Sequence, residues 1–300
     1  MNHKLTPGTV LMLVVPPLLW AGNAVVGRAV ADLIPPITLN FVRWVLAFLM
    51  LLPFGWRVFR PGSGLWRRRR LYAVLGLLGV GVYNSMQYLA LHTSTPINVT
   101  LVGASMPVWM LVVGRLFFQS VIAPRQLLGA ALSIAGVAIV LAQGQLAQLL
   151  QFRFVIGDIY MLTATIVWSV YSWLLTRTTD HGRLRSHWAQ FLMAQLAFGV
   201  VWSGVFAGVE WSFTPAAIHW GWPLAAVLLY VSIGPAIIAF RCWGAGVQRA
   251  GPATAGFFNN LTPLFAAVMS TAFLGDLPQA YHALAFALIV SGIVLSSGRR

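Results

Sequence analysis

Long apolar stretches of the chain alternate with short segments that are rich in arginine, proline and glycine. An α-helix needs about 20 mostly apolar residues to cross the hydrocarbon core of a bilayer. The stretches do not show the alternating polarity of outer-membrane strands, so helices rather than a barrel are expected. The pattern predicts an all-α integral membrane protein with ten transmembrane helices, over residues 8–31, 37–56, 71–91, 96–118, 124–144, 157–176, 187–208, 222–245, 252–274 and 279–297.

The two halves of the chain carry the same pattern of residues. The segment TPINVTLVGASMP at residues 95–107 resembles GPATAGFFNNLTP at residues 251–263, with both prolines displaced by 156 positions. The same offset carries Gly136 onto Gly292, each within a closing apolar stretch. Internal repeats in a membrane protein are typical of transporters, which hold a substrate between the repeats.

A second correspondence pairs Trp20 with Trp168, at an offset of 148 that fits a longer loop in the second half. Five spans in each half is an odd number, so the second half must enter the membrane from the opposite side. The sequence therefore predicts two inverted five-helix repeats, over residues 1–144 and 157–300, which are joined by a Gln-rich linker over 145–156.

The composition also indicates a polytopic membrane protein. Hydrophobic residues make up 59% of the chain and charged residues 8%, whereas a soluble domain carries about 25% charged residues. The net charge of +14 could indicate nucleic-acid binding, but the arginines lie in short loops between apolar stretches, where they orient helices in a bilayer. The expected partner is therefore the lipid bilayer and not nucleic acid. The single Cys242 excludes an internal disulfide.

The distribution of charge between the loops predicts how the helices are oriented. With the N-terminus in the cytoplasm, four of the five acidic residues fall on or near the outer side: Asp32, Asp158, Glu210 and Asp276. The cytoplasmic segments then hold most of the basic residues, namely Lys4, Arg57, Arg60, Arg67, Arg68, Arg69, Arg70, Arg115, Arg125, Arg177, Arg183, Arg185, Arg249, Arg299 and Arg300. Because positive charge favours the inner side, both termini are predicted to be cytoplasmic.

The repeat unit resembles the EamA module of the drug/metabolite transporter superfamily. The resemblance rests on the two prolines of the fourth span, a polar break (Gln119-Ser120 or Gly275-Asp276) and a glycine-centred last helix. The segment LLWAGN at 18–23 and Arg43 also resemble the module, whereas neither copy has the Glu of its usual Gly-Glu break. The resemblance implies a ten-helix exporter of amino acids or other metabolites in the inner membrane of a bacterium. The richness in aromatic residues resembles the amino-acid exporters of the YddG type.

Polar side chains inside a span are costly unless they face protein or water, so they mark candidate substrate-binding residues. In the third span, Tyr83, Asn84, Gln87 and Tyr88 share one face of the helix. Their hydroxyl and amide groups could bind a zwitterionic substrate, while the rings supply apolar contact. Hydrogen bonds that only hold the helices together explain the same residues equally well.

Aromatic and polar residues also mark the first and sixth spans. Trp20 and Asn23 stand in the first span, and Trp168, Tyr171 and Ser172 stand at helical spacing in the sixth. Both tryptophans lie near mid-depth, where anchoring to the membrane interface is not expected. We therefore expect the two indole rings on opposite walls of a central cavity.

Three further candidates lie near the prolines of the fourth and ninth spans, namely Trp109, Asn259 and Asn260. A proline loosens its helix, so the asparagines could contact a substrate or cap a kink. Arg43 lies inside the second span and needs a partner, either Asp32 or the carboxylate of a substrate.

The sequence favours a secondary transporter over an enzyme or a channel. Histidines and acids do not cluster in the sequence, so neither catalysis nor a metal or other cofactor is expected. No acid or histidine sits centrally in a span, so a mid-membrane carboxylate is not expected to couple transport to protons. The predicted substrates are small molecules, above all aromatic or large neutral amino acids, which are exported by alternating access. Cationic drugs, nucleosides and sugars remain alternatives, as does an integral-membrane enzyme, and the oligomeric state is open, with a monomer allowed.

Overall fold

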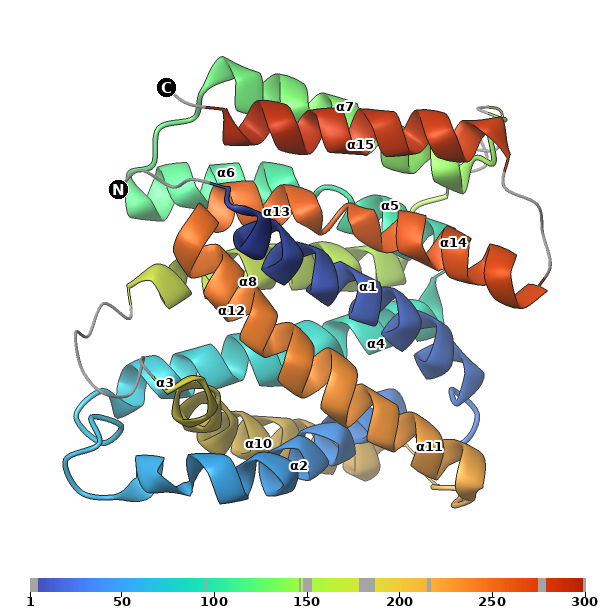
Figure 1. The fold of residues 1–300 in the computed structure, drawn as a ribbon. Helices are drawn as coiled ribbons and strands as arrows, with labels where there is room; N and C mark the ends of the chain where they lie inside the picture. Colours follow the sequence, from blue (N-terminus) through green and yellow to red (C-terminus); the bar gives the residue numbers. More distant parts are fainter. Residues whose placement is uncertain are drawn as a thin grey trace.

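Helices make up all the regular structure of the residues that the computed structural model describes, which are 5–94, 96–145, 147, 153–177, 187–214, 217–274 and 279–298. The long helices pack side by side in a bundle (Figure 1). Within the described ranges, nine helical segments are long and apolar enough to cross a membrane. The prediction of an all-α membrane protein is therefore confirmed.

The first half of the chain contains five of these segments, and their ends lie within a few residues of the predicted ones. The helices are α1 (Pro7–Ala29), α2 (Pro36–Gly55) with the short η1 (Trp56–Phe59), a third span of α3 (Arg69–Gly76), η2 (Leu77–Val82) and α4 (Tyr83–Thr93), a fourth of α5 (Pro96–Gly103) and α6 (Met106–Phe118), and α7 (Pro124–Leu141).

The second half repeats this order, and one span in each half differs from the prediction. Its helices are α8 (Ile156–Thr176), α10 (Trp188–Phe213), an eighth span of α11 (Trp222–Val231), η4 (Ser232–Ile238) and α12 (Ala239–Ala250), then α13 (Pro252–Phe258), α14 (Leu261–Leu274) and α15 (Ala280–Ser297). The ninth span, predicted as one helix over 252–274, is divided into α13 and α14 by a turn at Asn259 and Asn260. The fourth span, predicted as one helix over 96–118, is divided in the same way by a turn at Ala104 and Ser105.

Prolines explain both the starts of helices and their interruptions. The helices α2, α7 and α13 begin at a proline, whose missing N–H would have no partner in a first turn. Inside a helix, a proline removes a hydrogen bond and clashes with the carbonyl of the preceding turn. The interruptions between α5 and α6 and between α13 and α14 lie just before Pro107 and Pro263. The repeated sequence thus breaks the fourth and ninth spans at corresponding places.

The two halves are inverted with respect to each other. In Figure 1, α1 leads away from the end of the bundle at which both termini lie, and α8 leads back toward that end. The last helices of the two halves, α7 and α15, pack directly together. A Cβ atom on Gly129 would lie 2.8 Å from the Gly292 carbonyl oxygen, and one on Gly136 would lie 2.9 Å from the Ala285 oxygen. The repeat offset exchanges these two contacts, as a two-fold axis between the helices requires.

A hydrogen bond joins the two helix interruptions. The Asn260 side-chain amide donates to the Ala104 carbonyl oxygen at 3.2 Å, and these residues are 156 positions apart. The amide also donates to the Ser133 hydroxyl at 2.9 Å. Since 156 is the offset of the repeat, this contact lies where the first half meets its own counterpart in the second half.

The third and eighth spans also share an irregularity. Each contains a segment of wider π-type helix, η2 in the first half and η4 in the second. Leu77 and Ser232, which begin these segments, are 155 positions apart. Such segments occur often at functional sites, because they change the direction of side chains within a helix. Both halves therefore place an irregular helix beside the centre of the bundle.

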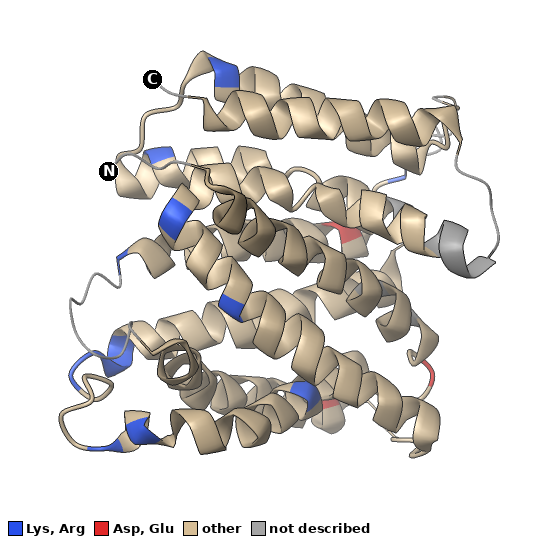
Figure 2. Cartoon of the chain, in the orientation of Figure 1, with Lys and Arg blue, Asp and Glu red and all other residues tan. Residues whose placement is uncertain are grey.

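The ends of the bundle differ in charge. We call the end at which both termini lie the terminal face, and the other end the opposite face. Figure 2 shows most lysine and arginine residues at the terminal face and the described acidic residues toward the opposite face. This separation agrees with the predicted loop charges. Several residues used for that prediction lie outside the described ranges, namely Lys4, Asp276, Arg183, Arg185, Arg299 and Arg300.

Candidate functional site

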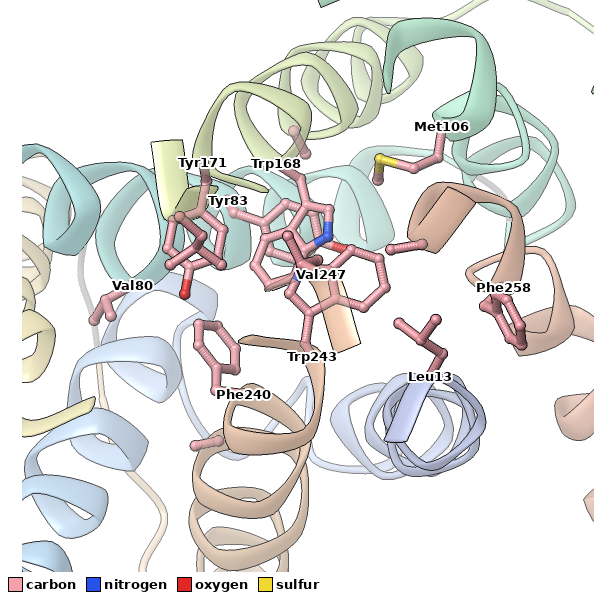
Figure 3. Packing of buried hydrophobic residues seen from close by; sticks show 14 of the residues in the cluster. Leu13, Val80, Tyr83, Met106, Trp168, Tyr171, Phe240, Trp243, Val247 and Phe258 are labelled. Carbon is pink, nitrogen blue, oxygen red and sulfur yellow. The ribbon is translucent and has the colours of Figure 1, made fainter. Parts of the chain in front are cut away.

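A cluster of aromatic rings fills the centre of the bundle. Trp168 on α8 is fully buried, and its ring centroid lies 4.5 to 5.5 Å from those of five other rings. Figure 3 shows members of this cluster converging from α4, α8 and α12. We call the six rings the aromatic cluster: Trp20, Tyr83, Trp168, Tyr171, Phe240 and Trp243.

The two repeat-related tryptophans lie closer together than the sequence predicted. Trp20 and Trp168 meet edge to face, with 5.2 Å between their ring centroids. They therefore contact each other instead of forming opposite walls of an open cavity. Large rings pack in this way because edge-to-face contact suits their charge distribution. Whether either ring contacts a substrate stays a prediction.

Polar atoms at the edge of the cluster form hydrogen bonds between helices. The Trp20 indole N–H donates to the Pro235 carbonyl oxygen in η4 at 3.2 Å, and the Trp243 N–H donates to the Ser172 hydroxyl at 3.0 Å. The Tyr171 hydroxyl donates to the Gln195 side-chain oxygen at 2.8 Å. The buried Trp168 N–H has no hydrogen-bond partner in the described part of the chain.

A cavity of about 190 Å³ extends from the aromatic cluster to the terminal face. Tyr171 and Phe240 form its inner end, and Trp188 and Arg249, at the terminal-face ends of α10 and α12, lie at its outer end. A water molecule needs about 10–15 Å³ on the same measure, so a small organic molecule fits. The lining residues are Met12, Tyr171, Leu175, Trp188, Phe191, Leu192, Gln195, Phe240, Arg241, Gly244, Ala245, Gln248 and Arg249.

The chemistry of this cavity is aromatic, amide and basic. Gln195 and Gln248 supply amide groups along the wall. Arg241 is exposed, as a snorkelling arginine would be, and its guanidinium lies 4.3 Å from the centre of the Trp188 ring. Among the described lining residues, none is acidic. The arrangement can bind an apolar side chain at the inner end and a negatively charged group near the entrance.

A much smaller cavity lies at the opposite face. The cavity on that side measures about 10 Å³ and is bounded by α1, α2 and α4 through Gly27, Leu39 and Tyr88, among others. Two buried carboxylates bind neighbouring helices there. Asp158 accepts hydrogen bonds from the Ser94 hydroxyl at 2.6 Å, the Asn98 amide at 3.1 Å and the Val155 N–H at 2.9 Å.

Glu210 makes the second of these connections at the opposite face. Its carboxylate accepts hydrogen bonds from the backbone N–H groups of Ile37 and Thr38, at 3.0 and 2.8 Å, and from the Thr38 hydroxyl at 2.7 Å. These donors belong to the first turn of α2, where a negative charge is favourable. The two acids therefore join α8 to the α4–α5 region and α10 to α2.

Arg43 is buried between α1, α2 and α4, on the opposite-face side of the cluster. Its Nη1 donates to the Tyr88 hydroxyl at 2.8 Å and to the Asn23 side-chain oxygen at 3.4 Å. The Tyr88 hydroxyl in turn donates to Asn23 at 2.9 Å. The pairing with Asp32 that the sequence suggested is wrong, because Asp32 is exposed and Arg43 is 0% exposed. The three residues Asn23, Arg43 and Tyr88 are called the Arg43 cluster.

The candidate residues of the third span do not act as one set. Tyr83 belongs to the aromatic cluster and Tyr88 to the Arg43 cluster, whereas the Asn84 amide donates to the Gly79 carbonyl oxygen within the same span, at 3.1 Å. Gln87 is half-buried. The shared helix face that the spacing predicted is therefore divided between different neighbours.

The remaining candidates lie elsewhere. Asn260 joins the two interruptions, whereas Asn259 and Trp109 are half-buried and are not among the residues that line the cavity at the terminal face. Sequence reasoning missed Phe240, Trp243 and Gln195. An aromatic pair at i and i+3 in the eighth span and a glutamine inside the seventh were the signals that could have revealed them.

The described residues include no group of three His, Cys, Asp or Glu side chains that could hold a metal ion. The site therefore offers packing, hydrogen bonds and guanidinium charge. These interactions suit recognition of a solute within a membrane protein.

Comparisons with known proteins bear on both halves. The model of the EamA-like transporter family matches residues 7–142 and again residues 155–298. An uncharacterized transporter of Archaeoglobus fulgidus is 26% identical over 100% of this chain and 99% of that protein. A probable terminal-alkyne amino-acid exporter of Streptantibioticus cattleyicolor is 25% identical over 76% of this chain and 73% of that protein.

A solved crystal structure has the same fold, with a TM-score of 0.73, 22% identity and 96% coverage of both chains. One of the two relatives is named as a transporter and the other as an exporter, and neither name describes an enzyme. The inverted helical repeats and the match of the family model to each half lead to one conclusion. This chain belongs to the EamA-like transporter family of membrane transporters.

Proposed function

We propose that the protein exports amino acids with aromatic or large neutral side chains across the inner membrane of a bacterium. The observation that carries this proposal is the cavity of about 190 Å³, which joins an aromatic inner end to an arginine at its entrance. Tyr171 and Phe240 offer apolar surface to a side chain, and Arg241 offers a positive charge to a carboxylate. The Streptantibioticus cattleyicolor relative, named as a probable amino-acid exporter, adds support.

The alternative substrates fit the cavity less well. A cationic drug would meet Arg241 and Arg249 without an acidic side chain among the described lining residues. Sugars and nucleosides could stack on the aromatic rings, but they carry no group that uses the guanidinium charge. The chemistry of the lining therefore favours a solute with a carboxylate and an apolar side chain.

Alternating access is the mechanism that this geometry supports. A cavity open toward one face, beside two inverted repeats, is the arrangement of a carrier caught in one of its two states. The paired interruptions and the paired π-type segments give both halves places at which helices can bend. We propose that the terminal face is cytoplasmic, since basic residues concentrate there. The cavity would then accept substrate from the cell interior.

Counterflow in proteoliposomes tests the proposal. Vesicles loaded with one unlabelled solute are mixed with labelled phenylalanine, leucine, glucose, uridine or tetraphenylphosphonium, and protein-free vesicles serve as the control. We expect accumulation of the labelled amino acids and not of the other solutes. Accumulation of uridine, glucose or the cation without any amino acid would overturn the amino-acid assignment, and no accumulation of any solute would contradict transport of this class.

A further inference from the structure

We propose that Arg43 binds the carboxylate of the transported substrate midway through the membrane. This inference rests on the proposed function and specifies it, because it makes the carboxylate the group that is recognised inside the protein. The observation is a fully buried guanidinium of which one edge has no partner. Nε and Nη2 of Arg43 are buried and make no hydrogen bond within the described chain.

The unpartnered atoms have the geometry that a carboxylate requires. Nε and Nη2 lie side by side on one edge of the planar guanidinium, and their N–H groups point the same way. A carboxylate accepts both N–H groups at once in a bidentate pair. The other terminal nitrogen, Nη1, is held by Tyr88 and Asn23 at 2.8 and 3.4 Å. The Arg43 cluster thus fixes the guanidinium and leaves the bidentate edge unused.

The charge of Arg43 also lacks compensation. A buried charge is costly unless a counter-charge accompanies it, and guanidinium does not lose its proton. No described carboxylate pairs with Arg43: Asp32 is exposed, and Glu210 accepts its hydrogen bonds from Ile37 and Thr38. The rings of Trp44 and Tyr88 lie 4.9 and 5.9 Å from the guanidinium carbon and contribute a cation–π interaction. That interaction does not use the N–H groups of the bidentate edge.

Arg43 lies between the cavity at the terminal face and the small cavity at the opposite face. Trp44, the next residue on α2, packs edge to face on Phe240 at 4.8 Å, and Phe240 forms the inner end of the terminal-face cavity. Tyr88, which holds Arg43, lines the small cavity at the opposite face. A solute that moves from one cavity to the other therefore passes the guanidinium. Because the edge is buried in this state, the carboxylate reaches it when the contact between Trp44 and Phe240 opens.

Paired substrates test this assignment. Counterflow is measured for labelled phenylalanine and for labelled phenylalaninamide, which has the same side chain and amine but no carboxylate. We expect the wild-type protein to carry phenylalanine at least about tenfold faster than the amide, because the amide leaves the buried charge unpaired. Arg43→Gln should lower phenylalanine transport by at least about tenfold and abolish the preference. Arg43→Lys keeps the charge without the planar fork. Its rate of phenylalanine transport and its preference over the amide should therefore lie between those of the wild type and those of Arg43→Gln.

Controls separate the possible failures. Arg60→Gln alters an exposed terminal-face arginine and should match the wild type. Thermal unfolding in detergent, followed by tryptophan fluorescence, shows which variants fold. If Arg43→Gln does not fold, the assignment is tested with folded Arg43→Lys, through its ratio of phenylalanine transport to phenylalaninamide transport. An unchanged preference in the folded variant, or equal transport of acid and amide by the wild type, would overturn the assignment while amino-acid export stands. If the wild type carries no amino acid, the proposed function fails first.

Discussion

The two ends of the bundle differ in the size of their cavities and in the bonds that join their helices. At the terminal face, the cavity of about 190 Å³ reaches the aromatic cluster. At the opposite face, a cavity of about 10 Å³ is present, and Asp158 and Glu210 accept five hydrogen bonds from neighbouring segments. Apolar contact alone does little to distinguish helix from lipid, so such polar bonds contribute much of the specificity of closure.

The repeat makes this difference informative. The offset that pairs Trp20 with Trp168 places Val10 at the position that corresponds to Asp158. Val10 lies near the start of α1 at the terminal face and cannot accept hydrogen bonds through its side chain, so that face lacks a counterpart of the connection that Asp158 makes at the opposite face. The two halves therefore share a fold without sharing their closing contacts. We infer that the state open to the terminal face is favoured by bonds that have no equivalent in the other state.

The largest expected effect comes from filling the terminal-face cavity. Gly244 lines it, and a Cβ atom there would meet no other atom within 4 Å. Gly244→Phe should thus occupy the cavity without strain and reduce counterflow of phenylalanine by at least about tenfold, since the substrate loses its site. Gly208→Phe is the matched control, because Gly208 is exposed on α10, away from the cavity, and also has open space around its Cβ position. Equal loss of transport in both variants would contradict the role of this cavity.

A smaller effect is expected from opening the opposite face. Asp158→Ala removes the acceptor of three hydrogen bonds, at least one of them worth about 2 kcal/mol because the acceptor is charged. Losing about 2 kcal/mol should raise the ratio of protein that is open at the opposite face to protein that is closed there by roughly thirtyfold. A cysteine introduced at Ala31, which lines the small cavity, with Cys242 replaced by Ser, reports the change through faster labelling by an impermeant maleimide.

The control for this labelling experiment is Asp32→Asn. Asp32 is also an acid near the opposite face, but it is exposed and does not hold helices together through any bond described above. Its neutralisation should leave the labelling rate unchanged. If a folded Asp158→Ala variant is labelled no faster than the protein that retains Asp158, then Asp158 does not keep the opposite face closed.

Much of this architecture could be predicted from the sequence, because apolar length and repeated prolines act locally. The starts of α7 and α13 at Pro124 and Pro252 follow directly from the chemistry of proline. The division of the ninth span at Asn260 was harder to predict. There the amide donates to Ala104, which is 156 positions away, and a single-helix pattern does not show such a partner.

The site could be predicted only in part. Trp20 and Trp168 were singled out by their correspondence, but their direct contact depends on how α1 and α8 lie relative to each other. Arg43 needed a partner by its position in a span, yet its actual partners, Asn23 and Tyr88, come from two other helices. Phe240 was missed because a phenylalanine in an apolar helix looks like any other core or lipid-facing residue. Contacts between distant segments therefore account for most of what the sequence did not show.

The smallest effect is expected at the boundary between the cavity and the aromatic cluster, where Tyr171→Phe removes one hydroxyl and keeps the ring. The hydroxyl donates to the Gln195 side-chain oxygen at 2.8 Å, and both residues line the cavity. The bond joins two protein groups, so its loss acts on binding by releasing the Gln195 amide from its position, and its worth of about 1 kcal/mol sets an upper limit of roughly fivefold on the change in affinity. The half-saturating concentration of phenylalanine in counterflow should rise by up to that factor, with the maximal rate unchanged, because the ring still forms the inner end of the cavity. If instead the maximal rate falls with the affinity unaltered, the hydroxyl acts in the conformational change, and the inner end of the cavity belongs to the moving contact rather than to the binding surface.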